Sequence, residues 1–384
     1  MRKICIVTGS RAEYGLLSRL MRLIKEDSDL CLQVIATNMH LSAEFGLTYK
    51  EIENDGFRID KKVEMLLSSD TANAMTKSVG LANIGFADAY EDLKPDLLLV
   101  LGDRYELLAA VTAAMFYKIP IAHIHGGEIT EGAYDDTIRH AVTKMSHLHF
   151  TSTEIYRNRV IQLGENPERV FNVGAIGLDN IRHIDLLSKK ELEKSLSFKF
   201  GEKCILVTFH PVTLGNNPSG EQMMNLLKVL DEMGDLRIIF TLPNSDSNGR
   251  IIIQLINQFA LKNSDRSVVF TSLGQLKYLS ALKYVDAVVG NSSSGIIEAP
   301  SFMIPTLNIG TRQNGRIKAG SVVDCMPVSE DIKRNLIMVM SENFRESCRN
   351  IRNPYEKKGT ASEIFLIIKN IKLNNLINKV FYNL

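Results

Sequence analysis

The segment HIHGGEITEGAYDD, from His123 to Asp136, places two histidines and four carboxylates directly behind an apolar run. Imidazole and carboxylate groups can exchange protons near neutral pH when their surroundings tune them. We therefore predict an acid/base cluster formed by His125, Glu128, Asp135 and Asp136. A metal site is the weaker alternative. His123 and His125 share a face only if a strand continues that far, and no third ligand is evident.

Three further positions in the first half of the chain follow apolar runs. Arg11, in TGSRAEYG, suits a phosphate beside a helix N-terminus, with a solvated arginine as the alternative. The same segment lacks the three glycines of a dinucleotide fingerprint, so it does not indicate a nicotinamide cofactor. Asp103 and Arg104, in LGDRYE, are site candidates, and a helix N-cap is the alternative for the aspartate. His40 is another candidate, with a hydrogen-bonded structural histidine as its alternative.

The second half of the chain has polar turns that are typical of a nucleotide site. His210 lies at the end of an apolar run. In GNSSSGIIEAP, Ser292 and Ser293 precede an expected helix, where backbone N–H groups bind anions. Within that helix Glu298 could accept a hydrogen bond from a ribose hydroxyl, and NIGTRQNGR offers Arg312 and Arg316 for a diphosphate. These residues predict a nucleotide-diphosphate ligand with the chemistry on its other half, as in an enzyme that transfers or remodels a nucleotide sugar.

The pattern of the elements explains why these candidates should converge. Apolar runs such as residues 3–9 and 95–103 alternate with amphipathic stretches such as residues 14–27. Strands that are apolar throughout and joined by helices indicate parallel sheets covered on both faces. We predict an α/β fold with two doubly wound Rossmann-like domains facing across a cleft. In such sheets ligands bind at the carboxyl ends of the strands.

A charged and polar stretch near residues 170–200 predicts the domain boundary. We expect an N-terminal domain of residues 1–175 that carries the sugar and catalytic groups. Residues 176–365 should form a C-terminal domain that binds the nucleotide. Residues 366–384 are expected to form a C-terminal helix and tail.

Composition excludes several classes of protein. The chain has 384 residues, of which 45% are hydrophobic and 23% charged, which is typical of soluble globular proteins. A formal net charge of +1 gives no support for a nucleic-acid or membrane partner. The five cysteines are scattered and form no CxxC pair, which favours a reduced, cytoplasmic protein. No apolar run is long enough for a membrane span.

Taken together, the motifs resemble those of one protein family. They occur in the same order as in that family and extend over almost the whole chain. They are TGSRAEYG, NMHLSAEFG, LGDRYE, HIHGGE, DDTIRHAVTKMSHLHF, RVIQLGE, FHPVT, GNSSSGIIEAP and NIGTRQNGR. The sequence is similar to the hydrolysing UDP-N-acetylglucosamine 2-epimerases of bacterial sialic acid synthesis, the NeuC-type enzymes. This resemblance implies the two-domain GT-B fold and a homodimer or homotetramer.

The resemblance also implies a reaction without a metal or redox cofactor. A base removes the proton at C2 of the sugar while UDP leaves C1. Water then adds to the resulting 2-acetamidoglucal, and a proton returns to C2 from the opposite face. The substrate is then a UDP-sugar, and the products are N-acetylmannosamine and UDP.

Site residues can be carried over position by position from the family. Asp103 and Asp135 match catalytic carboxylates, although one extra residue separates GGE from DD here. His210 matches a nucleotide-contacting position and is also a catalytic candidate. The other matches to nucleotide-contacting positions are Arg11, Ser292, Ser293, Glu298 and Arg312. Gly15 stands where several relatives have serine.

One position departs from the pattern of many relatives, which read HIEGGE with a catalytic glutamate. Here His125 occupies that position. Either the imidazole takes over the proton transfer, or Glu128 or Asp103 does so. Two other activities remain open. One is the same reaction on a nucleotide-linked 2,4-diacetamido-2,4,6-trideoxyglucose, and the other is a GT-B glycosyltransferase.

Overall fold

The first strand, β1 (Arg2–Thr8), shows how the sequence builds a buried parallel sheet. Ile4 and Ile6 lie in the core on one face of the sheet, whereas Cys5 and Val7 lie in the core on the other. Side chains alternate between the two faces of a strand, so a strand that is apolar at every position must be covered on both sides. The computed structural model describes residues 1–212, 219–243 and 249–384.

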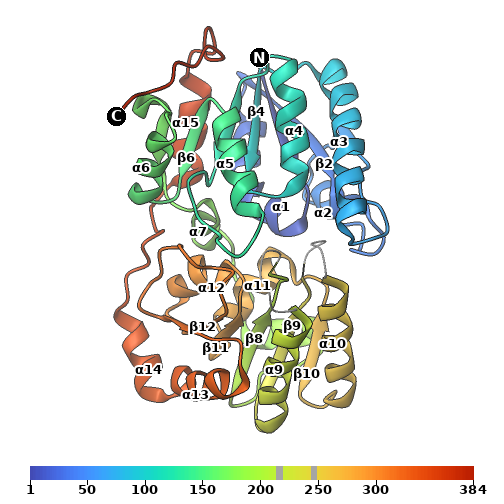
Figure 1. Ribbon diagram of the computed structural model, residues 1–384, viewed down its shortest axis with the longest axis vertical. Coiled ribbons are helices and arrows are strands. Elements are labelled where there is room, and N and C mark those ends of the chain that lie inside the picture. Colours follow the sequence, from blue (N-terminus) through green and yellow to red (C-terminus); the bar gives the residue numbers. More distant parts are fainter. Residues whose placement is uncertain (213–218, 244–248) are drawn as a thin grey trace. The chain divides into compact units, whose positions relative to one another are not determined.

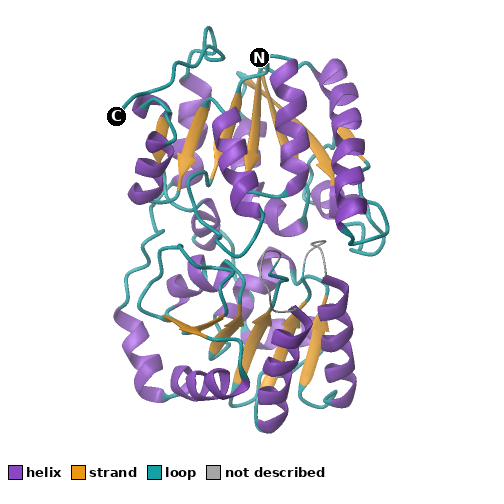
Figure 2. Ribbon diagram, in the orientation of Figure 1, coloured by secondary structure: helices purple, strands orange, loops and turns teal. Residues whose placement is uncertain are grey.

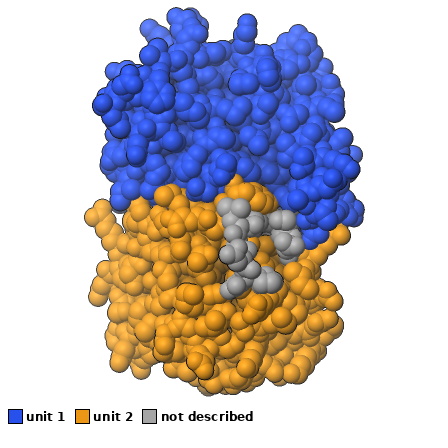
Figure 3. Space-filling view, viewed as in Figure 1, with its two compact units in different colours: residues 1–128, 135–182, 357–384 blue, residues 129–134, 183–356 orange. Residues whose placement is uncertain are grey.

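Two compact units make up the described chain (Figure 3). Unit 1 contains residues 1–128, 135–182 and 357–384, and unit 2 contains residues 129–134 and 183–356. The units therefore change over after Arg182 and Glu356, whereas the boundaries predicted from the sequence are residues 175 and 365. Unit 2 also contains the short segment 129–134, which was expected in the first domain.

Unit 1 is built on a parallel sheet with the order β3-β2-β1-β4-β5-β6-β7 (Figure 1). The strands after β1 are β2 (Leu30–Thr37), β3 (Lys61–Val63), β4 (Leu97–Leu101), β5 (Ile121–Ile124), β6 (Leu148–Thr151) and β7 (Val170–Asn172). Helices α1, α7 and α15 pack on the face of Ile4, and α3, α4 and α5 on the face of Cys5. The helices of the unit are α1 (Arg11–Glu26), α2 (Tyr49–Asn54), α3 (Ala72–Leu93), α4 (Tyr105–Phe116), α5 (Asp135–Met145), α6 (Glu154–Gln162), α7 (Ile176–Ile181) and α15 (Thr360–Asn370).

Unit 2 has a second parallel sheet, with the order β10-β9-β8-β11-β12-β13. Its strands are β8 (Cys204–Thr208), β9 (Arg237–Thr241), β10 (Ser267–Phe270), β11 (Ala287–Gly290), β12 (Thr306–Ile309) and β13 (Val322–Cys325). Figure 2 shows strands enclosed by helices in each unit. The helices here are α8 (Lys189–Leu196), α9 (Ser219–Glu232), α10 (Gly249–Lys262), α11 (Gly274–Leu282), α12 (Ser294–Ile297), α13 (Ser329–Met340) and α14 (Glu342–Ser347).

In both sheets the order reverses between two adjacent strands. The reversal lies between β1 and β4 in unit 1, and between β8 and β11 in unit 2. Doubly wound sheets bind ligands at this switch point, beyond the carboxyl ends of the strands. The prediction of two doubly wound Rossmann-like units is confirmed.

Two helices are shorter than the sequence pattern predicts. The expected helix over residues 295–303 is a single turn, α12, followed by a 3-10 turn at Ala299–Phe302. Pro300 has no N–H to continue the α-helix, which accounts for the break. At the C-terminus, α15 ends at Asn370, and residues 371–384 contain only turns and irregular backbone.

Two predictions from composition concern the state of the cysteines and the lack of a membrane-spanning segment. All five cysteines are free thiols, and four of them are buried. Among the described residues, no helix has the length and apolar character needed to cross a membrane.

Asp179 fixes the returning C-terminal helix to unit 1. Its buried carboxylate accepts hydrogen bonds from the backbone N–H groups of Gly359 (3.1 Å) and Ala361 (3.2 Å), at the start of α15. It also pairs with Arg19 of α1 at 3.2 Å. One carboxylate thus satisfies the N-terminus of α15 and joins it to α1 and α7.

We expect Asp179→Asn to lower the free energy of unfolding of unit 1 by about 2 kcal/mol, because the amide NH₂ cannot accept from a backbone N–H. Urea unfolding followed by circular dichroism measures the change. Asp92→Asn is the matched control, since that carboxylate is 60% exposed in its pair with Lys61. Equal effects of the two substitutions would contradict the assignment.

Candidate active site

His123, on β5, shapes the turn that precedes Asp103. Its Nε2–H donates to the Gly102 carbonyl at 2.7 Å, and its Nδ1 accepts from the Thr143 hydroxyl at 3.1 Å. Burial lowers the pKa of His123 to about 3, so the ring is neutral near pH 7. Gly102 has φ +85°, a conformation that favours glycine, and its N–H donates to the Ile124 carbonyl at 3.0 Å. We conclude that His123 positions the turn.

His125 lies beyond the end of β5 and has φ +66°, so it does not share a strand face with His123. This corrects the expectation on which the His-x-His metal site depended. Its Nε2 accepts the backbone N–H of Ile176, the first residue of α7, at 3.2 Å. The ring proton of the neutral form must therefore be on Nδ1, which lies 3.5 Å from Glu128 Oε1. In this tautomer the Ile176 N–H occupies the acceptor nitrogen of the ring, and the Nδ1–H lies near Glu128.

Close packing explains the glycines that follow His125. Gly127 has φ +78°, and a Cβ added there would lie 2.5 Å from the Tyr156 carbonyl oxygen. Any side chain at this position would push the loop away from α6. The glycine therefore allows the neighbouring Glu128 to enter the protein interior.

Arg139, on α5, joins the acidic groups of unit 1. Its side chain is 2% exposed, and Nη2 donates to Asp103 Oδ2. Nη1 donates to the His125 carbonyl at 3.0 Å and lies 3.8 Å from Glu128 Oε2. Asp135 is the first residue of α5, one turn before Arg139. One guanidinium thus sets the positions of the segments that carry Asp103, His125 and Glu128.

The carboxylates of this cluster differ in their exposure. Glu128 is 1% exposed and accepts the Ser152 hydroxyl at 2.7 Å. Asp135 is buried at the helix N-terminus, where a negative charge is favoured. Asp103 is 20% exposed, and Arg104, not Asp103, occupies the N-cap position of α4. Asp103 is therefore the carboxylate of this group that is best placed to meet a ligand.

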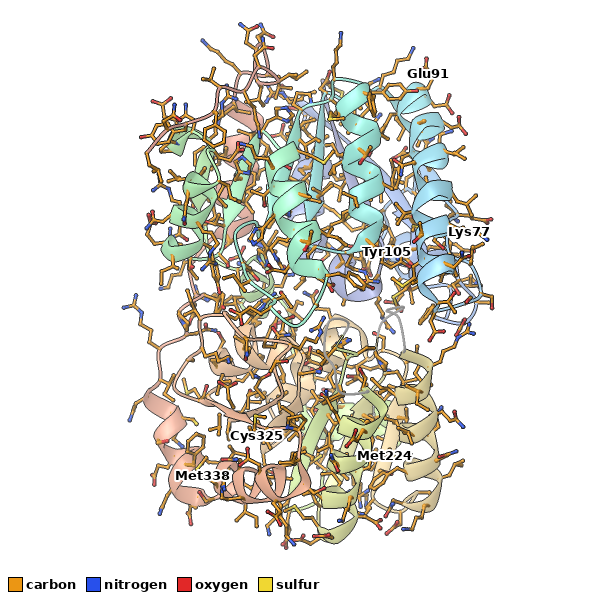
Figure 4. All side chains as sticks on the ribbon, in the orientation of Figure 1. Lys77, Glu91, Tyr105, Met224, Cys325 and Met338 are labelled. Atoms are coloured by element: carbon orange, nitrogen blue, oxygen red, sulfur yellow. The ribbon has the colours of Figure 1, made fainter. Side chains whose placement is uncertain are left out.

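Arg11, Arg104 and His40 have partners within unit 1. Arg11 Nε pairs with Glu51 Oε2 at 2.5 Å, and Arg104 Nε donates to Glu106 Oε1 at 2.9 Å. Arg104 precedes Tyr105, which is labelled at the start of α4 in Figure 4. His40 is completely buried, and its ring nitrogens lie 3.1 Å from Thr8 Oγ1 and 2.9 Å from Thr48 Oγ1. This geometry agrees with the structural alternative for His40.

In unit 2 the switch point is organised by Asn291, which follows β11. Its Oδ1 accepts the His210 N–H at 2.6 Å, and its Nδ2 donates to the His210 carbonyl at 2.8 Å. Arg312 Nη1 (3.2 Å) and Gln313 Nε2 (2.8 Å) both donate to the Asn291 carbonyl. The side chain of Asn291 thus ties the segment after β8 to the segment after β11, while its backbone anchors Arg312.

The remaining candidates of unit 2 lie close to this point in the chain. Ser292 and Ser293 are half-buried ahead of α12, where Ser293 is the N-cap residue without a side-chain cap bond. Glu298 is the C-cap of α12, and is not inside a longer helix as predicted. Arg316 Nη2 donates to Thr130 Oγ1 at 3.3 Å, within unit 2. The last residue of the FHPVT motif, Thr213, lies outside the described residues.

Sequence reasoning missed Arg139, Asn291 and Ser152. The signal for Arg139 was its spacing of four residues from Asp135 on an amphipathic helix, which places both on one face. Asn291 belongs to the motif GNSSSGIIEAP, in which only Ser292, Ser293 and Glu298 were predicted to be site residues. In the part of the chain that the structure describes, no group of three His, Cys, Asp or Glu side chains is arranged to hold a metal ion.

The sequence is similar over most or all of its length to a family model and to several known proteins. The family model described as UDP-N-acetylglucosamine 2-epimerase matches residues 22–369. A GDP/UDP-N,N'-diacetylbacillosamine 2-epimerase (hydrolyzing) of Campylobacter jejuni is 44% identical over 384 residues, covering 100% of this chain and 99% of its own. Polysialic acid biosynthesis protein P7 of Escherichia coli is 38% identical over 389 residues, covering 100% and 98%.

A solved structure supports the fold. The S. aureus MnaA-UDP co-structure covers 100% of both chains with a TM-score of 0.81. At 18% sequence identity this likeness concerns the architecture.

We expect Arg139→Met to lower the free energy of unfolding of unit 1 by about 3–5 kcal/mol, because it leaves the carboxylates of Asp103 and Glu128 without their cation. Urea unfolding followed by circular dichroism at pH 7 measures the change.

Arg157→Met is the matched control for that experiment, since the Arg157 side chain is 27% exposed. Adding Glu128→Gln to Arg139→Met should restore part of the lost stability. If the double variant recovers no stability, Arg139 acts through packing alone.

Proposed function

Since the chain belongs to the UDP-N-acetylglucosamine 2-epimerase family, we propose that it is a hydrolysing 2-epimerase of a nucleotide-linked 2,4-diacetamido-2,4,6-trideoxyglucose. The full-length similarity to the Campylobacter jejuni enzyme carries this proposal. It favours this sugar over UDP-N-acetylglucosamine, the substrate expected first from the sequence. UDP-N-acetylglucosamine is the second candidate, and similarity to a polysialic acid biosynthesis protein supports it.

The reaction needs two proton transfers and a leaving group. A carboxylate takes the proton from C2 as the C1–oxygen bond breaks and the nucleotide leaves with the bonding electrons. Water then adds its hydroxyl to C1 of the glycal, and a proton is delivered to C2 from the opposite face. Side chains alone can supply these protons.

The geometry of unit 1 suggests how its residues divide this work. Asp103 is partly exposed and held by Arg139, so we assign it one of the two proton transfers at C2. Asp135, at the start of α5, is the candidate for the other. His125 and Glu128 bind each other and the surrounding protein, which supports a positioning role for both.

The groups of unit 2 suit the nucleotide half of the same substrate. Ser292 and Ser293 offer hydroxyl and N–H groups, and Arg312 offers a cation anchored on Asn291. Such groups bind phosphate oxygens by charge-assisted hydrogen bonds. Glu298 remains the candidate acceptor for a ribose hydroxyl.

We expect the protein to release UDP or GDP from the diacetamido-trideoxy substrate without any acceptor. In D₂O the 2-epimerised sugar product should carry deuterium at C2, because the returning proton comes from exchangeable groups. Mass spectrometry of the product and an assay of free nucleotide measure both. UDP-N-acetylglucosamine, run in parallel, should give kcat/KM at least about tenfold lower, as expected when polar and apolar pocket contacts are mismatched.

Two results would argue against the proposed reaction. Nucleotide release that requires an acceptor would indicate a glycosyltransferase. Product without deuterium at C2 would exclude the elimination route. A preference for UDP-N-acetylglucosamine would leave the reaction intact and select the second candidate substrate.

We expect Asp103→Asn to reduce kcat by about a thousandfold, which is the usual size of a lost acid or base. His125→Gln should retain kcat within about tenfold, because the glutamine oxygen can still accept the Ile176 N–H. Steady-state kinetics on both variants, with Asp92→Asn as the matched control, separates the roles. A hundredfold or larger loss in His125→Gln would instead make His125 a proton-transfer group.

A further inference from the structure

Two buried carboxyl groups, those of Glu13 and Glu106, pack against Gly9 in the turn after β1, outside the cluster around Arg139. Glu13 lies in the first turn of α1 and is 6% exposed, whereas Glu106 lies in the first turn of α4 and is 0% exposed. These helices follow β1 and β4, the two strands that flank the switch point of the sheet.

Gly9 is the residue around which the two carboxyls pack. A Cβ added to Gly9 would lie 2.0 Å from Glu106 Oε1, so the Glu106 carboxyl fills the space that a side chain at position 9 would need. The Gly9 N–H donates to Glu13 Oε2 at 2.6 Å. Both carboxyls are therefore fixed against the same short piece of backbone.

The charges at this point do not balance if both carboxyls are ionised. Arg104 Nε donates to Glu106 Oε1 at 2.9 Å, and its side chain is 11% exposed. Glu13 Oε1 and Glu106 Oε2 are buried, and neither has a hydrogen-bond partner among the residues that the structure describes. Two buried anions beside one guanidinium are strongly unfavourable, and a proton on one carboxyl relieves this.

The neighbouring groups agree with a protonated carboxyl. Burial, and then the charge of Glu106, raise the pKa of Glu13 to about 8, against the lowering effects of the Gly9 N–H and Arg104. Arg11, on the same helix, pairs with Glu51. His40 contributes no charge near neutral pH, because burial lowers its pKa to about 4.

We propose that Glu13 and Glu106 share one proton at neutral pH, and that the resulting singly charged pair positions Arg104 at the switch point of unit 1. The pair acts as a positioning device. It holds the guanidinium by Nε and ties the turn after β1 to the start of α4, directly beside Asp103. Its expected effect on substrate binding rests on the proposed function, whereas the shared proton does not.

The stability of Glu13→Gln as a function of pH tests the shared proton. A carboxyl whose folded pKa is raised contributes stability at low pH and loses that contribution as pH rises through the folded value. The Tm of the wild type minus that of Glu13→Gln should therefore fall between about pH 5 and pH 8, by roughly 5 °C or more, and then level off. The buried histidines titrate in both proteins, so the difference isolates Glu13.

Glu53→Gln is the matched control, since this carboxyl of unit 1 is 46% exposed in its pair with Lys62. Its Tm difference from wild type should not depend on pH. If Glu13→Gln does not fold, infrared difference spectra of the wild type between pH 6 and pH 9 should still show loss of a protonated carboxyl band. A pH-independent Tm difference for Glu13→Gln, or absence of that band, would overturn the proposal.

Steady-state kinetics of Glu106→Gln at pH 7 then tests the positioning role. Loss of the carboxylate partner of Arg104 should raise KM for the nucleotide sugar about tenfold, the value of one charge-assisted contact, with kcat within about twofold. Glu106→Asp should recover part of the affinity. An unchanged KM would overturn the positioning role. Absence of turnover in the wild type would instead contradict the proposed function, and the Tm comparison would still decide the shared proton.

Discussion

The buried guanidinium of Arg139 is the interaction on which the site of unit 1 depends. A cation at 2% exposure is tolerated only where anions and carbonyl oxygens surround it. Here those partners come from three places, the segment after β4, the turn after β5 and the loop that carries Glu128. Because the acceptors converge on one planar guanidinium, the positions of the carboxylates around it depend on α5, the helix that carries Arg139.

Both units use the same construction at the carboxyl ends of their strands. In unit 1 the His123 ring bonds to Gly102, which lies beyond the neighbouring strand. In unit 2 the Asn291 side chain bonds to both backbone groups of His210. In each case a buried polar side chain at or just beyond the carboxyl end of one strand bonds to the backbone beyond the neighbouring strand, so the flanking functional group keeps its place. Such supporting bonds make a rigid site from segments that would otherwise be loops.

Much of this arrangement was predictable from the amino-acid sequence. Apolar strands alternating with helices predict the two doubly wound units that the structure has. The rule that ligands bind beyond strand ends selects Asp103 and His210, which follow β4 and β8. The hydrogen-bond and ion-pair partners of these residues were not predictable. His125 has a positive φ, which a histidine rarely adopts, and its ring bonds to the first residue of α7. Arg139 is an ordinary polar residue in the sequence, and only the fold shows that it is buried. Glu13 and Glu106 are likewise far apart in the sequence, with β2, β3 and β4 between them.

The path of the chain through unit 1 has a consequence for its synthesis. Helix α15, held by Asp179 and packed on α1 and the sheet, belongs to unit 1 but comes from residues 360–370. While a ribosome is still making unit 2, the apolar face of α1 that α15 covers therefore stays open to solvent. Domains that are contiguous in sequence can fold as soon as they emerge, but unit 1 is complete only after residues 360–370 have been made. A chain interrupted between residues 183 and 356 would keep Asp103, Glu128 and Asp135 and still expose an unfinished core to chaperones and proteases.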